Sequence, residues 1–288
     1  MRTHPYTLQE VTALQTEALS RQSPEALAAA GADLGALAAA AALSNEQAGR
    51  IVTAAGIEAI ADPDARASLE TAFDRTEQLF GRVRLTPPTA EQLTQNGVDL
   101  AALGVQHERM TREGLEPAWV LAPILETGHW KQLYGNLEQD STLNHNGRIK
   151  AGGLYIDDDL SAAWSSLCDL PPTLPVTPLE VPGQATSSWT LRLIPATNGP
   201  TETNITHNDP SYPDKPTVHE YLTLQATRLQ ANEDPLDNST WTWLSGTVPD
   251  GSRAPVGDWG PDGGQVKLGR IDVDYRLGNL GVRLPVWG

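Results

Sequence analysis

The side chains of this sequence that could take part in catalysis or metal binding are its acidic residues and its histidines. The segment Thr206-His207-Asn208-Asp209 gathers an imidazole, an amide and a carboxylate, which general acid–base catalysis uses. Such a cluster acts only with a nucleophile in hydrogen-bond reach, and no Gly-x-Ser-x-Gly turn accompanies it. No two of the six histidines stand four residues apart, and His-Glu-x-x-His is absent. We predict no catalytic residues, and an enzyme with a metal on His207 and Asp209 stays an alternative.

The run Asp157-Asp158-Asp159 could supply oxygen ligands to calcium. Because consecutive residues of an extended chain point to opposite faces, these carboxylates converge poorly without a turn. We therefore interpret the run as a solvated turn or a helix cap. Calcium stays open there, and also at Asp272 and Asp274 if distant carbonyls complete the site. Otherwise we expect no metal and no cofactor, since the single cysteine, Cys168, lacks partners for a disulfide or a zinc site.

Tryptophan is the most informative residue type for binding. All eight tryptophans lie between Trp119 and Trp287, and most of them are expected to lie in a core. Trp259 stands between Gly257-Asp258 and Gly260-Pro261, which predicts a loop where an indole can stack on a sugar or a peptide. The alternative is that this indole folds back over the core. The predicted ligand-binding residues, exposed on one face of the last strands, are Trp243, Trp259, Asp272, Asp274, Tyr275 and Arg276.

The chain carries an excess of negative charge, because 36 acidic side chains oppose 20 basic ones and the formal net charge is −16. Nucleic acid and anionic lipid are bound largely through Lys and Arg, so neither is an expected partner. Residues 1–14 lack the apolar core of a signal peptide. We therefore expect a cytoplasmic protein, with export by another route or association with a virion as alternatives.

Alanine dominates the segment Ala26–Ala42, where it supplies eleven of seventeen residues. Alanine loses no side-chain entropy in a helix, and Ser23-Pro24-Glu25 resembles a helix N-terminus, so we predict an α-helical domain over residues 1–85. The segment is too weakly apolar to span a membrane, and we assign it to tight helix packing in docking or in homo-oligomers. Residues 86–114 are predicted to be a helical connector.

A second, α+β domain is predicted over residues 115–288. Its first strand, Leu115–Pro123, contains a compact apolar run bounded by prolines, whereas Trp189–Pro195 alternates apolar and polar residues as a half-buried strand does. Further predictions are helices at Trp130–Leu137 and Val218–Ala231, short strands at Gly152–Ile156, Trp241–Leu244, Gln265–Leu268 and Leu280–Val286, and an irregular loop at Pro171–Pro182.

Four segments near the C-terminus carry a pattern, namely Trp241–Gly246, Arg253–Trp259, Gly263–Leu268 and the Gly-Val-Arg-Leu strand Leu280–Pro285. They resemble the C-type-lectin fold in its broad bacterial sense, shared by formylglycine-generating-enzyme-like domains and the variable proteins of diversity-generating retroelements. The resemblance covers about the last fifty residues. It implies a scaffold whose loops and last strands display a binding surface, with function set by side chains rather than by the fold.

The chemistry of the enzymes with this fold is not expected here. Formylglycine-generating enzymes use a cysteine pair, and related iron-dependent sulfoxide synthases use a paired-histidine helix, neither of which this chain contains. A clear copy of the carboxylate and amide motif of calcium-dependent lectins is also missing. We therefore predict a non-enzymatic protein whose C-type-lectin-like domain binds a protein or glycan. A structural component of a phage or cell-surface assembly is the alternative.

Overall fold

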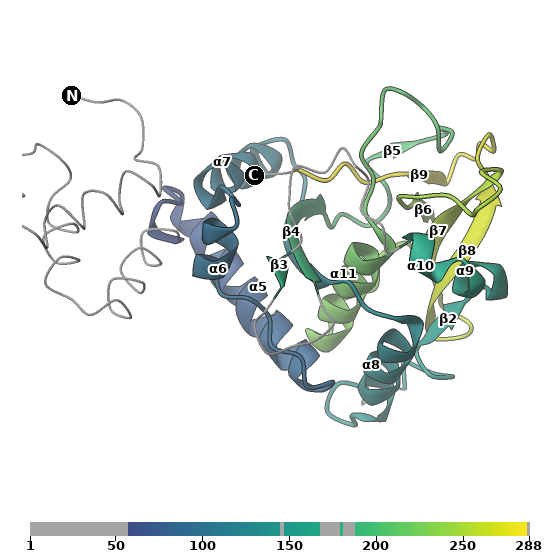
Figure 1. Ribbon diagram of the computed structural model, residues 1–288, viewed down its shortest axis with the longest axis horizontal. Coiled ribbons are helices and arrows are strands. Elements are labelled where there is room, and N and C mark those ends of the chain that lie inside the picture. Colours follow the sequence, from purple (N-terminus) through teal and green to yellow (C-terminus); the bar gives the residue numbers. More distant parts are fainter. Residues whose placement is uncertain (1–56, 145–146, 168–178, 181–187, 287–288) are drawn as a thin grey trace, which may run out of the picture. The chain divides into compact units, whose positions relative to one another are not determined.

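The computed structural model describes residues 57–144, 147–167, 179–180 and 188–286 (Figure 1). The chain divides into two compact units, residues 1–59 and 60–288, and the second unit is described below. It combines helices with two sheets, so the prediction of an α+β fold class is confirmed at that level. The helices predicted before residue 57, Cys168 and most of the loop predicted at Pro171–Pro182 lie outside the described residues.

A three-stranded antiparallel sheet has the order β1-β4-β3. Strand β1 (Pro117–Pro123) pairs along its whole length with β4 (Ser188–Pro195), from Pro117 opposite Pro195 to Pro123 opposite Trp189. Strand β3 (Leu179–Glu180) pairs with the start of β4. We predicted a half-buried β4, and this is wrong, because every residue from Trp189 to Pro195 is buried.

A six-stranded mixed sheet contains the C-terminal part of the chain. Its order is β2-β8-β7-β6-β9-β5, with parallel pairing between β2 and β8 and between β6 and β9. The strands are β2 (Leu154–Ile156), β5 (Glu202–Thr203), β6 (Trp241–Trp243), β7 (Arg253–Gly260), β8 (Gln265–Asp272) and β9 (Leu280–Val282). The four segments on which the resemblance depends form β6, β7, β8 and β9, which are neighbours in this sheet.

Among the described residues, three helices come before the first strand, and side-chain caps start each of them. Asp62 accepts a hydrogen bond from the Asp64 backbone N–H at 3.2 Å and is followed by a proline, which begins α5 (Pro63–Gly81). Thr89 begins α6 (Ala90–Gln95) with a full capping box, and Asp99 begins α7 (Leu100–Arg112). The helical structure predicted for residues 57–114 is confirmed.

Helices α5 and α7 pack into the second unit and do not form a separate domain or a connector. Helix α5 packs against β1, and α7 packs against β1 and β4. The ring of Phe80, at the end of α5, lies edge-on to Trp189 of β4 at a centroid distance of 5.3 Å. The predicted boundaries at residues 85 and 115 therefore differ from the division after residue 59, because the apolar faces of these helices are buried against the strands.

Helix α11 (Val218–Gln230) lies at the centre of the unit, where it packs against β1, β7, α5 and α8 (Thr127–Gln139) (Figure 1). It begins at the capping box of Thr217 and Glu220, and ten of its residues are buried. Two short helices, α9 (Asp158–Ala162) and α10 (Trp164–Leu167), follow β2. Within the described ranges, no helix is long and apolar enough to cross a membrane.

Candidate functional site

Two of the predicted ligand-binding residues, Trp243 and Trp259, lie in the core. Their exposed fractions are 0% and 4%, so the prediction that both indoles are exposed is wrong. Trp243 donates its indole N–H to the carbonyl of Ile205 at 3.1 Å. Trp259 belongs to strand β7 and not to a loop, because β7 pairs with β8 as far as Gly260.

The other four predicted residues lie at the exposed end of β8, in the sequence Asp272 to Arg276. Asp272, Asp274, Tyr275 and Arg276 are all exposed. Strand β8 ends at Asp272 and the chain then turns, so Asp272 and Asp274 do not share a strand face as predicted. Asp272 accepts a hydrogen bond from Arg253 at 3.2 Å. A ligand-binding role for this turn stays a prediction that competes with the site described below.

The predicted acid–base cluster holds a loop against the sheet. The ring nitrogens of His207 lie 2.9 Å from the Leu244 carbonyl oxygen and 3.2 Å from Asn208 Oδ1. Burial lowers the pKa of His207, and the nearby Lys215 ammonium lowers it further. The imidazole also lies edge-on to Trp243 at 5.4 Å. These contacts give His207 a packing role.

The acidic run Asp157–Asp159 caps α9, as predicted. Asp157 accepts a hydrogen bond from the Asp159 backbone N–H at 3.0 Å. Arg270 of β8 forms ion pairs with the carboxylates of both residues, at 3.1 Å for Asp157. Within the described part of the chain, no group of three or more histidine, cysteine or acidic side chains is placed to hold a metal ion.

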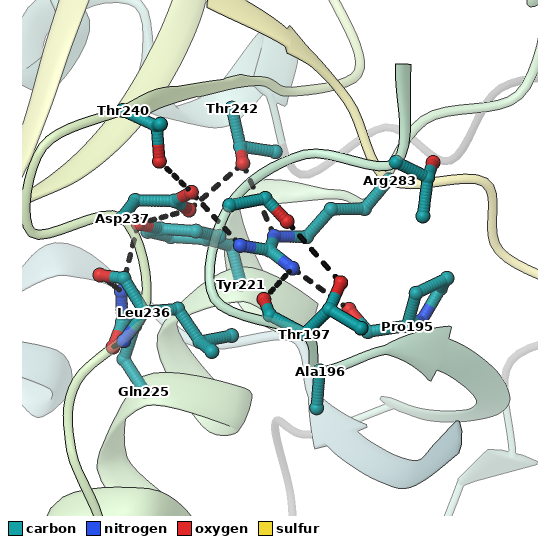
Figure 2. A network of polar contacts seen from close by, with 12 residues as sticks. Pro195, Ala196, Thr197, Tyr221, Gln225, Leu236, Asp237, Thr240, Thr242 and Arg283 are labelled. Carbon is teal, nitrogen blue, oxygen red and sulfur yellow. Dashed lines mark hydrogen bonds and ion pairs between the residues drawn. The ribbon is translucent and has the colours of Figure 1, made fainter. Parts of the chain in front are cut away.

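A buried polar network surrounds Asp237 (Figure 2). The Asp237 carboxylate accepts hydrogen bonds from Thr240 and Thr242 at 2.8 Å each, and from Tyr221 at 3.1 Å. Arg283 donates to the same carboxylate at 2.8 Å. The network therefore joins α11 to β6 and to the residue that follows β9.

A second buried ion pair joins α11 to β4. Arg192 and Glu220 are both fully buried, and Arg192 Nε lies 2.6 Å from Glu220 Oε1. Glu220 also accepts a hydrogen bond from the Thr217 backbone N–H at 2.7 Å. Because both partners lie in the core, this pair is part of the fold and is out of reach of a ligand.

One row of polar and aromatic side chains lies on the six-stranded sheet. The register sets Tyr155 of β2 opposite Lys267 of β8, and Lys267 opposite Asp258 of β7. Thr242 pairs with Gly257, so Trp241 of β6 lies beside Asp258. We call these four residues the outer row and the side of the sheet that carries them the outer face.

The outer row is accessible. Tyr155 is 50% exposed, and Lys267, Asp258 and Trp241 are half-buried. Trp241 also packs against an apolar cluster on the outer face that includes Trp243 and Val256. The row is therefore anchored in the core at Trp241 and opens to solvent at Tyr155.

Asp258, in the outer row, has a displaced pKa. Burial raises the pKa of Asp258 to about 6, while the Lys267 ammonium opposes the rise and the Asp237 carboxylate adds to it. The side chain of Lys267 lies across Gly260, where an added Cβ would fall 2.5 Å from its Nζ. The outer row can thus offer a hydrogen-bond donor and an acceptor between two aromatic rings.

No sequence pattern points to Tyr155, Lys267 and Asp258 as site residues. The strand Gly152–Ile156 was predicted, yet its parallel pairing with β8 joins segments more than a hundred residues apart, and no local pattern indicates it. Trp241 was placed in a strand, although its neighbours across the sheet were unknown. One local signal for an exposed position was the alternation of apolar and polar residues around Lys267, which lies between the buried residues Val266 and Leu268.

Comparison with known proteins finds no family model, no curated protein and no solved structure that matches this chain. The site is therefore interpreted from its own geometry. The C-type-lectin-like resemblance stays a prediction.

Proposed function

We propose that this chain is a binding protein that holds a polyhydroxylated ligand, such as an oligosaccharide, on the outer row. The observation that carries the proposal is the alignment of two aromatic rings, an ammonium and a carboxyl group across four adjacent strands. Aromatic faces stack on sugar rings, and the charged pair can bond to hydroxyl groups. A C-type-lectin-like domain with docking or oligomerisation by the N-terminal residues is part of this proposal.

Several polar side chains outside the outer row make contacts within the fold, and this supports a binding function over a catalytic one. His207 contacts a backbone carbonyl, Arg192 pairs with Glu220, and Arg283 pairs with Asp237, all in buried surroundings. A catalytic acid or base must be within hydrogen-bond reach of a substrate. The outer row, in contrast, presents aromatic and charged side chains that a ligand can reach from solvent.

The dimensions of the outer row favour an extended polar ligand over a large protein interface. Neighbouring strands lie about 4.8 Å apart, so the row from Tyr155 to Trp241 spans about 14 Å. Large exposed apolar side chains in the described residues are limited to Val105, Tyr155 and Tyr275. A stable protein interface buries about 800 Å² on each partner and has an apolar centre, which such scattered side chains do not provide.

A glycan microarray probed with the full chain tests the proposal. We expect binding to a defined set of oligosaccharides, and we expect the Tyr155→Ser variant to lose most of that signal. Val105→Ser is the matched control, because Val105 is 59% exposed on α7, outside the outer row. Absence of any bound glycan, or equal loss of signal in both variants, would contradict the proposal.

A further inference from the structure

A cleft on another part of the second unit has the features of a small-molecule site. It has a volume of about 340 Å³ and is lined by α5, the start of β1, the end of α11 and the segment that follows it. Its lining includes the apolar residues Ala72, Ala118 and Leu224 and the hydroxyl-bearing residues Ser68, Thr71 and Thr227. The charged residues of the lining are Arg75, Glu116, Arg228 and Glu233. None of these residues belongs to the outer row.

Two guanidinium groups in this cleft already hold a carboxylate. Arg75 Nη1 lies 2.8 Å from one Glu233 oxygen, and Arg228 Nη1 lies 3.3 Å from the other. The exposed fractions of the three side chains are 40% for Arg75, 18% for Arg228 and 36% for Glu233. The exposed Arg75–Glu233 pair contributes little net stability, so an incoming anion can replace Glu233 beside Arg75 at small cost.

Arg228 keeps its place without Glu233. Its Nε donates to the Asp234 carbonyl at 2.7 Å, and its Nη1 lies 3.5 Å from the Ala196 carbonyl. The Glu233 backbone is fixed as well, since its carbonyl accepts a hydrogen bond from Arg148 at 2.8 Å. The carboxylate of Glu233 can therefore swing away while the loop and Arg228 stay in position.

The interior of the cleft suits an apolar group. Ala118 of β1 and Leu224 of α11 form an apolar wall of the cleft, whereas the Trp119 ring stacks on His107 of α7 at a centroid distance of 5.8 Å. Leu224 and Ala118 belong to the same apolar cluster. A ligand with an apolar body against this wall would place an attached carboxylate near the two guanidiniums.

We propose that this cleft binds a small organic acid, with an apolar body against Ala118 and Leu224 and a carboxylate between Arg75 and Arg228 in place of Glu233. The site is independent of the glycan-binding function proposed above. A carboxylate is favoured over a polyanion, because Glu116 also lines the cleft and repels additional negative charge.

Isothermal titration calorimetry of the full chain with phenylacetate tests this proposal. We expect millimolar binding to the wild type and an affinity about tenfold higher for Glu233→Gln, which removes the internal competitor and corresponds to about 1.4 kcal/mol. Arg228→Ala should abolish binding, and Arg75→Lys should weaken it, because lysine cannot reproduce the fork of a guanidinium. Phenylacetamide, which lacks the charge, should not bind.

Two controls separate this site from general effects. Glu108→Gln removes a carboxylate from another surface ion pair, with Arg112 at 3.5 Å on α7, and should leave the affinity for phenylacetate unchanged. Tyr155→Ser should also leave it unchanged, which distinguishes failure here from failure of the glycan proposal. The proposal is overturned if Glu233→Gln binds phenylacetate no better than the wild type, or if phenylacetamide binds equally well.

Discussion

Asp237 Oδ1 lies 2.8 Å from Arg283 Nη2, and both side chains are fully buried. Asp237 follows α11, whereas Arg283 directly follows β9, so the pair joins the central helix to the six-stranded sheet. Arg283 also donates to the carbonyls of Pro195 and Thr197, at 2.9 and 2.7 Å, which reach the end of the other sheet. One ion pair therefore connects both sheets and α11 (Figure 2).

Breaking this pair should be strongly destabilising. Asp237→Asn leaves the Arg283 guanidinium buried without a counter-charge, and we expect a loss of about 3–5 kcal/mol in the free energy of unfolding, measured by urea denaturation. Arg253→Met is the control, because it removes one partner of the exposed Arg253–Asp272 pair and should cost under about 1 kcal/mol. Similar losses in the two variants would show that the buried pair has no special role.

Trp259 should matter for stability, and Tyr275 should not. Trp259→Ala removes a buried indole from β7 and should lower the free energy of unfolding by about 3–5 kcal/mol. Tyr275 is 46% exposed, so Tyr275→Ala should leave the melting temperature near that of the wild type. Circular dichroism melting of the two single variants measures the difference. A normal melting temperature for Trp259→Ala would place the indole outside the core.

The ends of several elements could be predicted from the sequence because their signals are local. Asp62 with Pro63, and Thr217 with Glu220, cap helices through groups within three residues of one another. Trp259 was misplaced because the glycines beside it resemble a turn. In the structure Gly257 is needed for close packing, since a Cβ there would lie 2.2 Å from the ring of Tyr221. That contact joins β7 to α11, and no local pattern contains it.

The candidate site was less predictable than the helices. Tyr275 and its neighbours were correctly placed on the surface, but the outer row depends on pairing between strands that are distant in sequence. Tyr155 and Lys267 are neighbours only because β2, at the edge of the sheet, pairs in parallel with β8. Polar and apolar alternation predicts which face a residue occupies within a strand, and it does not identify the neighbouring strand.

Asp258 should make stability depend on pH. Because the pKa of Asp258 is raised to about 6 in the folded chain, its protonated form is favoured there. The contribution of Asp258 to the free energy of unfolding is therefore fully present below pH about 4, the ordinary pKa of an aspartate. This contribution is lost as the pH rises through about 6. Asp258→Asn should be more stable than the wild type at pH 7, by about 1 kcal/mol after allowance for partial exposure.

Urea denaturation of Asp258→Asn and the wild type at several pH values isolates this effect. The difference in unfolding free energy between the two proteins should grow from pH 4 to pH 7 in favour of the variant. A constant difference across this range would mean that Asp258 titrates normally. Lys267→Met is a useful companion, because loss of the ammonium should raise the pKa of Asp258 further.

His219 should have the opposite dependence on pH. Burial lowers the pKa of His219 to about 3, and its Nδ1 accepts a hydrogen bond from the Trp130 indole at 3.1 Å. The neutral ring is therefore favoured in the folded chain. The contribution of His219 to the free energy of unfolding is present above pH about 6.5 and is lost as the pH falls toward 3. Melting curves of His219→Gln should lose part of the acid sensitivity of the wild type. His129→Gln, at an exposed position of α8, should keep all of it.

The most direct test of the outer row is a calorimetric titration with the oligosaccharide that gives the strongest microarray signal. Tyr155→Ala removes the exposed aromatic anchor, and we expect the affinity to fall about thirtyfold, which corresponds to about 2 kcal/mol. Lys267→Met should weaken binding as well, while Tyr275→Ala, on the turn after β8, should have no effect. If Tyr275→Ala abolishes binding and Tyr155→Ala retains it, the ligand sits on the turn and the outer row is not the binding site.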